Sequence, residues 1–246
     1  MHEQKGMSWR AGLWLALWLP VSALGAADEL VMIAPINQSM PYARFEGGRI
    51  SAGIIKDISE AVAQRAGRRI SFVSVTGDQV SSALREGRVD GICHVRPHWI
   101  DGDFHWSQPL IADAELIASH LDARVIRTLG DLRERPVGTV TGYRYPRVEQ
   151  VLGMHMRRDD AATMEENLKK MMGRGGPRHT IMGRNTLHYQ MKYNKALQLR
   201  PDLVFAEFSS QCAFSKKSLP VFADIDKAIT SLAEDGSVAA ILARYR

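Results

Sequence analysis

The sequence has few of the features that mark metal-binding, catalytic or nucleic-acid-binding chains. Only two of its 246 residues are cysteines, Cys93 and Cys212, and no CxxC pair occurs, so the usual zinc-site spacing is excluded. The net charge is +5, but lysine and arginine form no block of five or more, so a basic nucleic-acid-binding tail is missing. No GxSxG segment is present, which removes a common signature of a serine nucleophile. We therefore predict no nucleic-acid partner, no metal and no cofactor.

Long apolar runs are also scarce, and the one that stands out lies near the N-terminus. The segment AGLWLALWLPVSALGAAD, residues 11–28, follows Lys5 and Arg10, and its apolar stretch of about 15 residues is shorter than a membrane span. Gly25 and Ala27 fit the small-residue positions of a signal-peptidase site. This pattern predicts a signal peptide over residues 1–27 and export of the chain, with an uncleaved anchor as the alternative.

Export changes the interpretation of Cys93 and Cys212. Both cysteines lie in the exported part, and in an oxidising compartment an even cysteine count favours a disulfide. A reduced, buried pair is the alternative, because the fold must still bring the two side chains together.

Strand and helix patterns alternate through the exported part of the chain. Apolar runs predict strands at residues 29–35, 69–75, 89–95, 154–159, 178–183, 203–208 and 212–217, and one more at the end of 131–142. Apolar residues at helical spacing predict helices at residues 52–67, 79–87, 144–153, 162–175, 185–193, 221–235 and 237–246. We interpret the methionines of the fourth of these helices as core filler rather than as a binding surface.

Two successive runs of this kind predict an α/β fold with two lobes, each built on a mostly parallel sheet. The two C-terminal helices need a sheet to cover, so the chain is expected to return to lobe one after completing lobe two. Such a path crosses between the lobes twice. A cleft between two lobes is where a small ligand binds, and a hinge lets the lobes close on it.

Five segments follow one another in an informative order. They are MPYARFEGGRISAGIIKDISEAVAQRAG (40–67), ALREGRVDGI (83–92), FHWSQPLIADAELIAS (104–119), TLGDLRERPVGTVTGY (128–143) and CAFSKKSLPVFADIDKAITSLAEDGSVAAILARYR (212–246). Taken together, they resemble the family-3 extracellular solute-binding proteins, the periplasmic receptors of polar amino-acid ABC importers.

This resemblance implies a type II periplasmic-binding fold, in which two α/β lobes are joined by a two-strand hinge. Lobe one would comprise residues 28–109 and 210–246, lobe two residues 110–209, and the hinge residues 108–111 and 207–211. The resemblance also places Cys93 and Cys212 on neighbouring strands, which favours the disulfide. The implied function is that of a monomeric periplasmic protein that captures a small polar or anionic solute and delivers it to an ABC permease in the inner membrane.

The sequence departs from the family where the ligand is usually bound. The segment RPHWIDG, residues 96–102, stands where the family has a threonine and an arginine for the ligand carboxylate, and only Arg96 can substitute. Arg184 stands where the family has an aspartate for the ligand ammonium, and a cation there repels an ammonium group. Two arginines favour an anionic organic ligand over a zwitterionic amino acid. The alternative is that both arginines are solvated surface charges.

Further cleft residues follow from the same resemblance. The candidates are Asn37, Tyr42, Asp78, Trp99, Tyr143 and Tyr145. The tyrosines and the tryptophan offer flat faces for a planar or cationic group, and the turn at Tyr143 opens a helix whose N-terminus suits an anion. Packing or surface roles are the alternative for each, and we expect about half of the six to contact the ligand, because few polar groups line a typical cleft.

A metal site near Cys93 is not predicted. His94 follows it directly on a strand, so the two side chains point to opposite faces. His94 and His98 have HxxxH spacing, but that spacing needs a helix, which Pro97 disfavours.

Two other functions remain open at this stage. The same fold resembles that of periplasmic cyclohexadienyl dehydratases, whose chemistry needs a carboxylate acid or base, and Asp78 is the candidate for that role. The second is a ligand-sensing partner of a membrane receptor. The prediction is a binding protein and not an enzyme.

Overall fold

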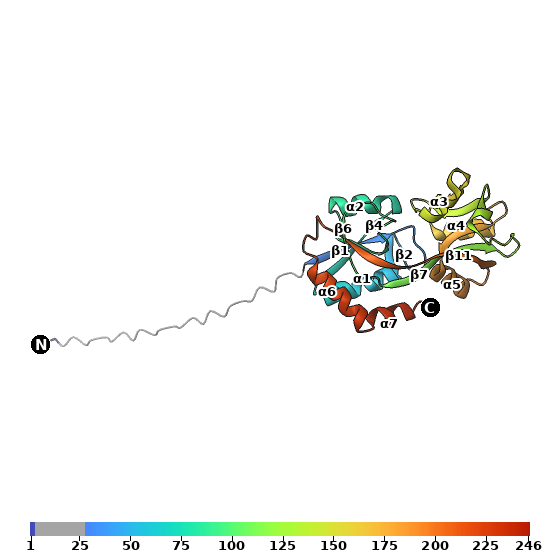
Figure 1. Ribbon diagram of the computed structural model, residues 1–246. Coiled ribbons are helices and arrows are strands. Elements are labelled where there is room, and N and C mark those ends of the chain that lie inside the picture. Colours follow the sequence, from blue (N-terminus) through green and yellow to red (C-terminus); the bar gives the residue numbers. More distant parts are fainter. Residues whose placement is uncertain (3–27) are drawn as a thin grey trace.

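The computed structural model describes residues 1–2 and 28–246, so the predicted signal peptide lies almost wholly outside the described residues. Two α/β lobes lie side by side, joined by the long strands β7 (Ile111–His120) and β11 (Leu199–Ser215), as Figure 1 shows. The two-lobed α/β architecture expected from the sequence is confirmed. Within the described part of the chain, no helix has both the length and the apolar character needed to cross a membrane.

Lobe one is a sheet with helices on both faces. Its strand order is β4-β1-β5-β11, in which β1 runs parallel to β4 and β5 while β11 is antiparallel to β5. These strands are β1 (Glu29–Pro35), β4 (Arg69–Val75) and β5 (Gly91–Val95), with short β6 (Phe104–Trp106) also paired to β11. Helix α2 (Val80–Glu86) covers one face, and the other is covered by α1 (Ile54–Arg65), α6 (Ala223–Glu234) and α7 (Ser237–Ala243) (Figure 1). A small hairpin, β2 (Arg44–Glu46) and β3 (Arg49–Ala52), precedes α1, and a single 3-10 turn, η1 (Gly77–Gln79), precedes α2.

Lobe two repeats this layered plan. Its strand order continues from β11 as β7-β10-β8-β9, with β8 parallel to both β9 and β10. The strands are β8 (Pro136–Val140), β9 (Arg157–Ala161) and β10 (His179–Gly183). One face packs against α3 (Pro146–Leu152) and the short η2 (Leu129–Leu132), the other against α4 (Met164–Met172) and α5 (Arg184–Tyr193).

Helix α4 illustrates how the sequence sets an element of this lobe. The Thr163 hydroxyl accepts a hydrogen bond from the Glu166 amide at 3.1 Å, which satisfies one of the free N–H groups at the helix start. Acidic residues in the first turn and lysines in the last turn both complement the helix dipole. Met171 is fully buried, as expected for core filler, whereas Met164 belongs to the core and also lines the cavity between the lobes.

The hinge is an antiparallel ladder that both lobes share. Residues of β7 pair with residues of β11 from Ile111 opposite Ser210 to His120 opposite Leu199. The register shifts twice along this ladder, between Pro201 and Leu203 and again between Val204 and Ala206. Irregularities of this kind bend a strand and increase its twist, so the ladder can follow the change of direction between the two sheets.

The strands of this hinge were the least well predicted elements. Residues 203–208 and 212–217 were expected to form two strands but belong largely to the single strand β11, and no strand was predicted at β7. The strand expected at 154–159 lies at 157–161, because a 3-10 turn, η3 (Gly153–His155), follows helix α3. Strands β1 and β4 have the bounds that the sequence predicted.

Helix α1 starts two residues later than the apolar spacing indicated, because the backbone at Gly53 is not helical. Gly53 has a φ of 124°, and a Cβ added there would lie 2.4 Å from the Tyr42 carbonyl oxygen. Only glycine fits this position, and the helix begins after it.

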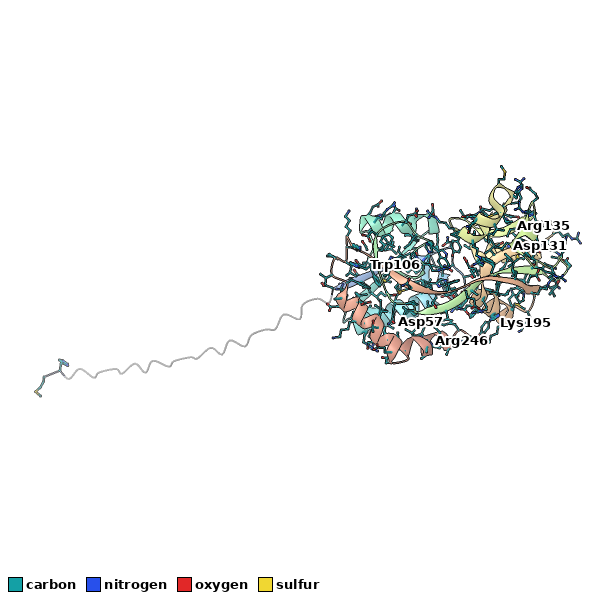
Figure 2. The ribbon with its side chains drawn as sticks, in the orientation of Figure 1. Asp57, Trp106, Asp131, Arg135, Lys195 and Arg246 are labelled. Atoms are coloured by element: carbon teal, nitrogen blue, oxygen red, sulfur yellow. A yellow bond between two sulfur atoms is a disulfide. The ribbon has the colours of Figure 1, made fainter. Side chains whose placement is uncertain are left out.

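The C-terminus of the chain lies beside the first turn of α1. Asp57 and Arg246 lie close together in the lower part of the molecule as drawn (Figure 2). The Tyr245 hydroxyl donates to Asp57 at 2.7 Å, and Lys192 of α5 donates to the Arg246 carbonyl at 2.6 Å. The chain end therefore contacts both lobes.

Cys93 and Cys212 form a disulfide, which agrees with the pairing implied by the family resemblance. The two residues face each other directly across β5 and β11, and both are fully buried in the core under α1 and α6. The link spans 119 residues of sequence, a span that includes all of lobe two. In the unfolded chain it closes a very long loop.

Replacing both cysteines by alanine is expected to lower the free energy of unfolding by about 2–5 kcal/mol, because the unfolded chain regains the entropy of the open loop. The measurement is urea unfolding of the oxidised wild type and of C93A/C212A, followed by far-ultraviolet circular dichroism. Equal unfolding midpoints with equal slopes would contradict this expectation.

Candidate functional site

A cavity of about 130 Å³ lies between the two lobes. Lobe one contributes the ends of β1 and β5 and the turn before α2, lobe two the turn after β8 and the end of β10, and the hinge strands form one wall. The predicted residues that line it are Asn37, Tyr42, Trp99, Tyr143 and Tyr145. The structure therefore brings together five of the eight residues singled out from the sequence.

The other three predicted residues do not line the cavity. Asp78 is exposed at the turn before α2. The Arg96 guanidinium lies over the rings of Phe208 and Trp99, at 4.7 and 5.6 Å from their centroids, and faces an outer groove. Arg184 pairs with Glu207 at 3.3 Å on the surface. The predicted pair of arginines facing an anion is not formed in the cavity, because both side chains turn outward from the backbone positions that the family alignment gave them.

His94 is a cavity residue that the sequence did not predict. Its ring stacks on Tyr42 with centroids 3.6 Å apart, and its Nδ1 lies 2.9 Å from the Ser210 hydroxyl. The residue has a φ of 65°, at a point where the register between β5 and β11 shifts. Left-handed backbone at a residue other than glycine costs energy, and it is found where a site requires a particular side-chain direction. Burial lowers the pKa of His94 to about 3, so the ring is neutral.

Asp113 on the hinge strand connects groups from both lobes. It accepts hydrogen bonds from the Tyr42 hydroxyl at 2.6 Å and from the Asn185 backbone amide at 2.9 Å. The Asn185 side chain in turn donates to the Tyr42 hydroxyl at 3.1 Å. Burial raises the pKa of Asp113, while these hydrogen bonds oppose the rise. A Cβ at Gly183 would lie 2.7 Å from the Asp113 carboxylate, so this network depends on a glycine at the end of β10.

The two lobes touch each other at the mouth of the cavity. The Asn37 side-chain amide of lobe one donates to the Thr141 carbonyl of lobe two at 3.2 Å. Arg144 of lobe two forms a two-bond ion pair with Asp101 of lobe one. A Cβ at Gly142, whose φ is 79°, would lie 2.9 Å from the backbone nitrogen of the residue after Gly77. The structure therefore has its lobes closed on one another.

Two buried polar atoms among the cavity residues have no hydrogen-bond partner within the described residues. They are the Asn37 Oδ1 atom and the Tyr143 hydroxyl. Burial raises the pKa of Tyr143 well above its usual range, so the hydroxyl stays protonated. Buried polar groups are nearly always satisfied, so these two residues of the cavity lining are exceptions in the hydrogen bonding of the fold.

Glu115 also lines the cavity and was missed by sequence reasoning. It follows Asp113 by two residues on β7, so both carboxylates lie on the same face of the strand. Burial raises the pKa of Glu115. The signal that could have found this pair is the run IADAELIAS, in which two carboxylates interrupt an otherwise apolar strand.

Residues 31–246 match the model of the bacterial extracellular solute-binding proteins, family 3. The chain belongs to this family. The resemblance noted in the sequence is thereby confirmed over nearly the whole described chain. No curated protein sequence matches this one.

Solved structures of two amino-acid-binding proteins and of one sensor domain share the fold. ArtJ, the arginine-, lysine-, histidine-binding protein of Geobacillus stearothermophilus, is 18% identical with a TM-score of 0.74, over 89% of this chain and 95% of that one. AbpA, an amino acid ABC transporter substrate-binding protein of Streptococcus pneumoniae solved with L-arginine, is 17% identical with a TM-score of 0.72, over 88% and 94%. A histidine kinase sensor domain similar to periplasmic binding proteins is 20% identical with a TM-score of 0.72, over 89% and 96%. At these identities the likeness concerns the fold alone.

In residues 28–246, no three histidine, cysteine or acidic side chains gather closely enough to hold a metal ion. His105, which lies on β6, stacks on Phe222 with centroids 5.0 Å apart.

Substituting Gly142 by alanine is expected to hold the lobes apart, because the added Cβ meets the backbone of lobe one. Gly236→Ala is the matched control: its φ of 82° gives the same backbone penalty of about 1–2 kcal/mol, but nothing lies within 4 Å of the added atom. Small-angle X-ray scattering should give a larger radius of gyration for G142A than for G236A. Equal radii in the two variants would show that contact at Gly142 does not set the closed arrangement.

Protonation of His94 is expected to make the wild type lose stability in acid. The folded pKa of about 3 lies below the unfolded value of about 6.5, so the unfolded chain binds a proton that the folded one excludes. As the pH falls below about 6.5, the free energy of unfolding should drop by about 1.4 kcal/mol per unit relative to His94→Asn. Asparagine tolerates a positive φ and does not titrate. Parallel urea titrations between pH 7 and 4.5 measure the difference, and a constant difference would refute a buried neutral ring.

Proposed function

We propose that this chain is a periplasmic receptor that captures a small polar solute in the interlobe cavity and delivers it to an ABC permease of the inner membrane. The observation that supports it best is the cavity itself, closed between two lobes and lined by residues from both of them. The buried carboxylate of Asp113 is already held by hydrogen bonds from Tyr42 and Asn185. Such a carboxylate has a structural role in the cavity wall, which fits a binding protein of family 3.

In the proposed mechanism the lobes move about the β7–β11 ladder. The proposed division assigns residues 28–109 and 210–246 to lobe one and residues 110–209 to lobe two, with the bends at 108–111 and 207–211. An open form admits the solute, and the solute stabilises the closed form by binding it more tightly than the open one. Asn37 and Tyr143, one from each lobe, are proposed to contact the solute together only in the closed form.

The enzyme alternative loses its main candidate. Asp78 was the carboxylate considered for a dehydratase-like proton transfer, but it is exposed and outside the cavity lining. Incubation with prephenate or arogenate, followed by ultraviolet absorbance of the aromatic product, tests that alternative directly.

Transport and sensing share the same closed receptor and differ only in the membrane partner. Genes for a permease and an ATPase beside this one would support delivery to a transporter, whereas a neighbouring kinase gene would support sensing.

Protein purified from its native host is expected to release a small molecule in native mass spectrometry. Stripping the molecule should increase the radius of gyration in solution scattering, and adding it back should restore the smaller value, because the bound solute favours the closed form. A radius of gyration that does not respond to any co-purified or added solute would count against the proposed function.

A further inference from the structure

Glu115 is the cavity residue whose chemistry the proposed function leaves unused. Its side chain is half-buried and lines both the cavity and the outer groove beside it. Among residues 28–246 no side chain or backbone group makes a hydrogen bond or ion pair with its carboxylate. A carboxylate removed from water is costly, and here only Arg96 and Arg147 compensate the charge, without a direct hydrogen bond or ion pair.

The neighbours of Glu115 explain why nothing covers its carboxylate. Across the sheet it faces Gly183 on β10 and Ala206 on β11, the two smallest side chains available. Gly183 itself lines the cavity. The strand pairing therefore leaves free space beside Glu115 rather than a packed side chain.

Aromatic rings frame the same part of the cavity. Trp99 and Phe208 meet edge to face with centroids 5.2 Å apart, and both line the cavity. Aromatic faces attract positive charge, and on the side of the outer groove this ring pair already holds the Arg96 guanidinium.

Positive charge is scarce on the cavity wall itself. Arg144 is the one lysine or arginine among the described lining residues, and Asp101 already holds its guanidinium through two hydrogen bonds. His94 is neutral. Arg96 and Arg147 act on Glu115 from the outer groove, outside the cavity. On the cavity wall a ligand carboxylate would thus meet other carboxylates and a paired arginine, whereas a ligand N–H would meet the carboxylate of Glu115.

The size of the cavity limits the ligand further. Its volume of about 130 Å³ is close to that of an engineered protein cavity of roughly 150 Å³ that holds one benzene molecule. In the closed form there is room for about one ring and a short substituent.

We propose that the cavity selects a compact amine: a one-ring or similarly small apolar body with a single cationic nitrogen and no carboxylate, its ammonium group bound by Glu115 and the faces of Trp99 and Phe208. This proposal rests on the proposed function and names its substrate class. It reverses the anionic ligand inferred from Arg96 and Arg184, since neither arginine lines the cavity.

The test is isothermal titration calorimetry with four one-ring probes of different charge: benzylamine (cationic), benzyl alcohol (neutral), phenylglycine (zwitterionic) and benzoate (anionic). Benzylamine is expected to bind at least about tenfold more tightly than the other three, and Glu115→Gln should remove about tenfold or more of that affinity while leaving benzyl alcohol unchanged. Glu207→Gln is the matched control, since this glutamate is exposed on the neighbouring hinge strand and lies outside the cavity lining.

Each contrary result has a definite meaning. Absence of benzylamine binding at millimolar concentration, equal or tighter binding of benzoate or phenylglycine, or unchanged benzylamine affinity in E115Q would overturn the amine proposal. The order of affinities in the wild type tests it even if E115Q fails to fold. An acidic or zwitterionic solute that closes the lobes would refute the amine while leaving the proposed function intact. Failure of every solute to change the radius of gyration would refute the proposed function itself.

Discussion

The antiparallel pairing of β7 with β11 is the constraint on which both lobes and the cavity depend. It is the only ladder that belongs to both sheets in the described chain, and its two register shifts let it turn from one sheet into the other. Because each strand presents alternate side chains to opposite faces, the same ladder that joins the lobes also points Asp113 and Glu115 into the cavity. A hinge made of paired strands would therefore keep part of the cavity wall in place during the proposed movement of the lobes.

Local strain and unmet hydrogen bonds occur at this wall and also elsewhere in the described fold. At the wall, His94 adopts a left-handed backbone, Asn37 and Tyr143 each keep a polar atom without a partner, and Gly142 admits the close approach of the lobes. Elsewhere, Glu134 has a positive φ, and polar atoms without a partner occur at Ser59, His105 and Asn167. The apolar cores on either side and the buried disulfide between β5 and β11 hold the elements that carry these residues. At the wall, unusual backbone such as that of His94 is what a binding site can require.

The sequence predicted the lobes better than it predicted the wall between them. Apolar spacing located β1 and β4 to the residue, and ordered family segments gave the fold and the cysteine pair, because these depend on burial patterns that repeat along the chain. Alignment positions for Arg96 and Arg184 did not tell where their side chains point, since a guanidinium can turn to Trp99 or Glu207 from the same backbone site. Strand β7 was hidden because an almost wholly buried strand shows no alternation.

The charge on the cavity wall links ligand choice to closure. In the closed structure Glu115 is half-buried, and burial raises its pKa because the charged form loses solvation. A cationic nitrogen at that place would return the lost stabilisation only in the closed form, where Trp99 and Phe208 also surround it. An anion would add to the penalty instead. The unpaired carboxylate thus gives the closed form the difference in affinity between ligands that a two-lobed receptor needs in order to close on one class of solute and remain open to others.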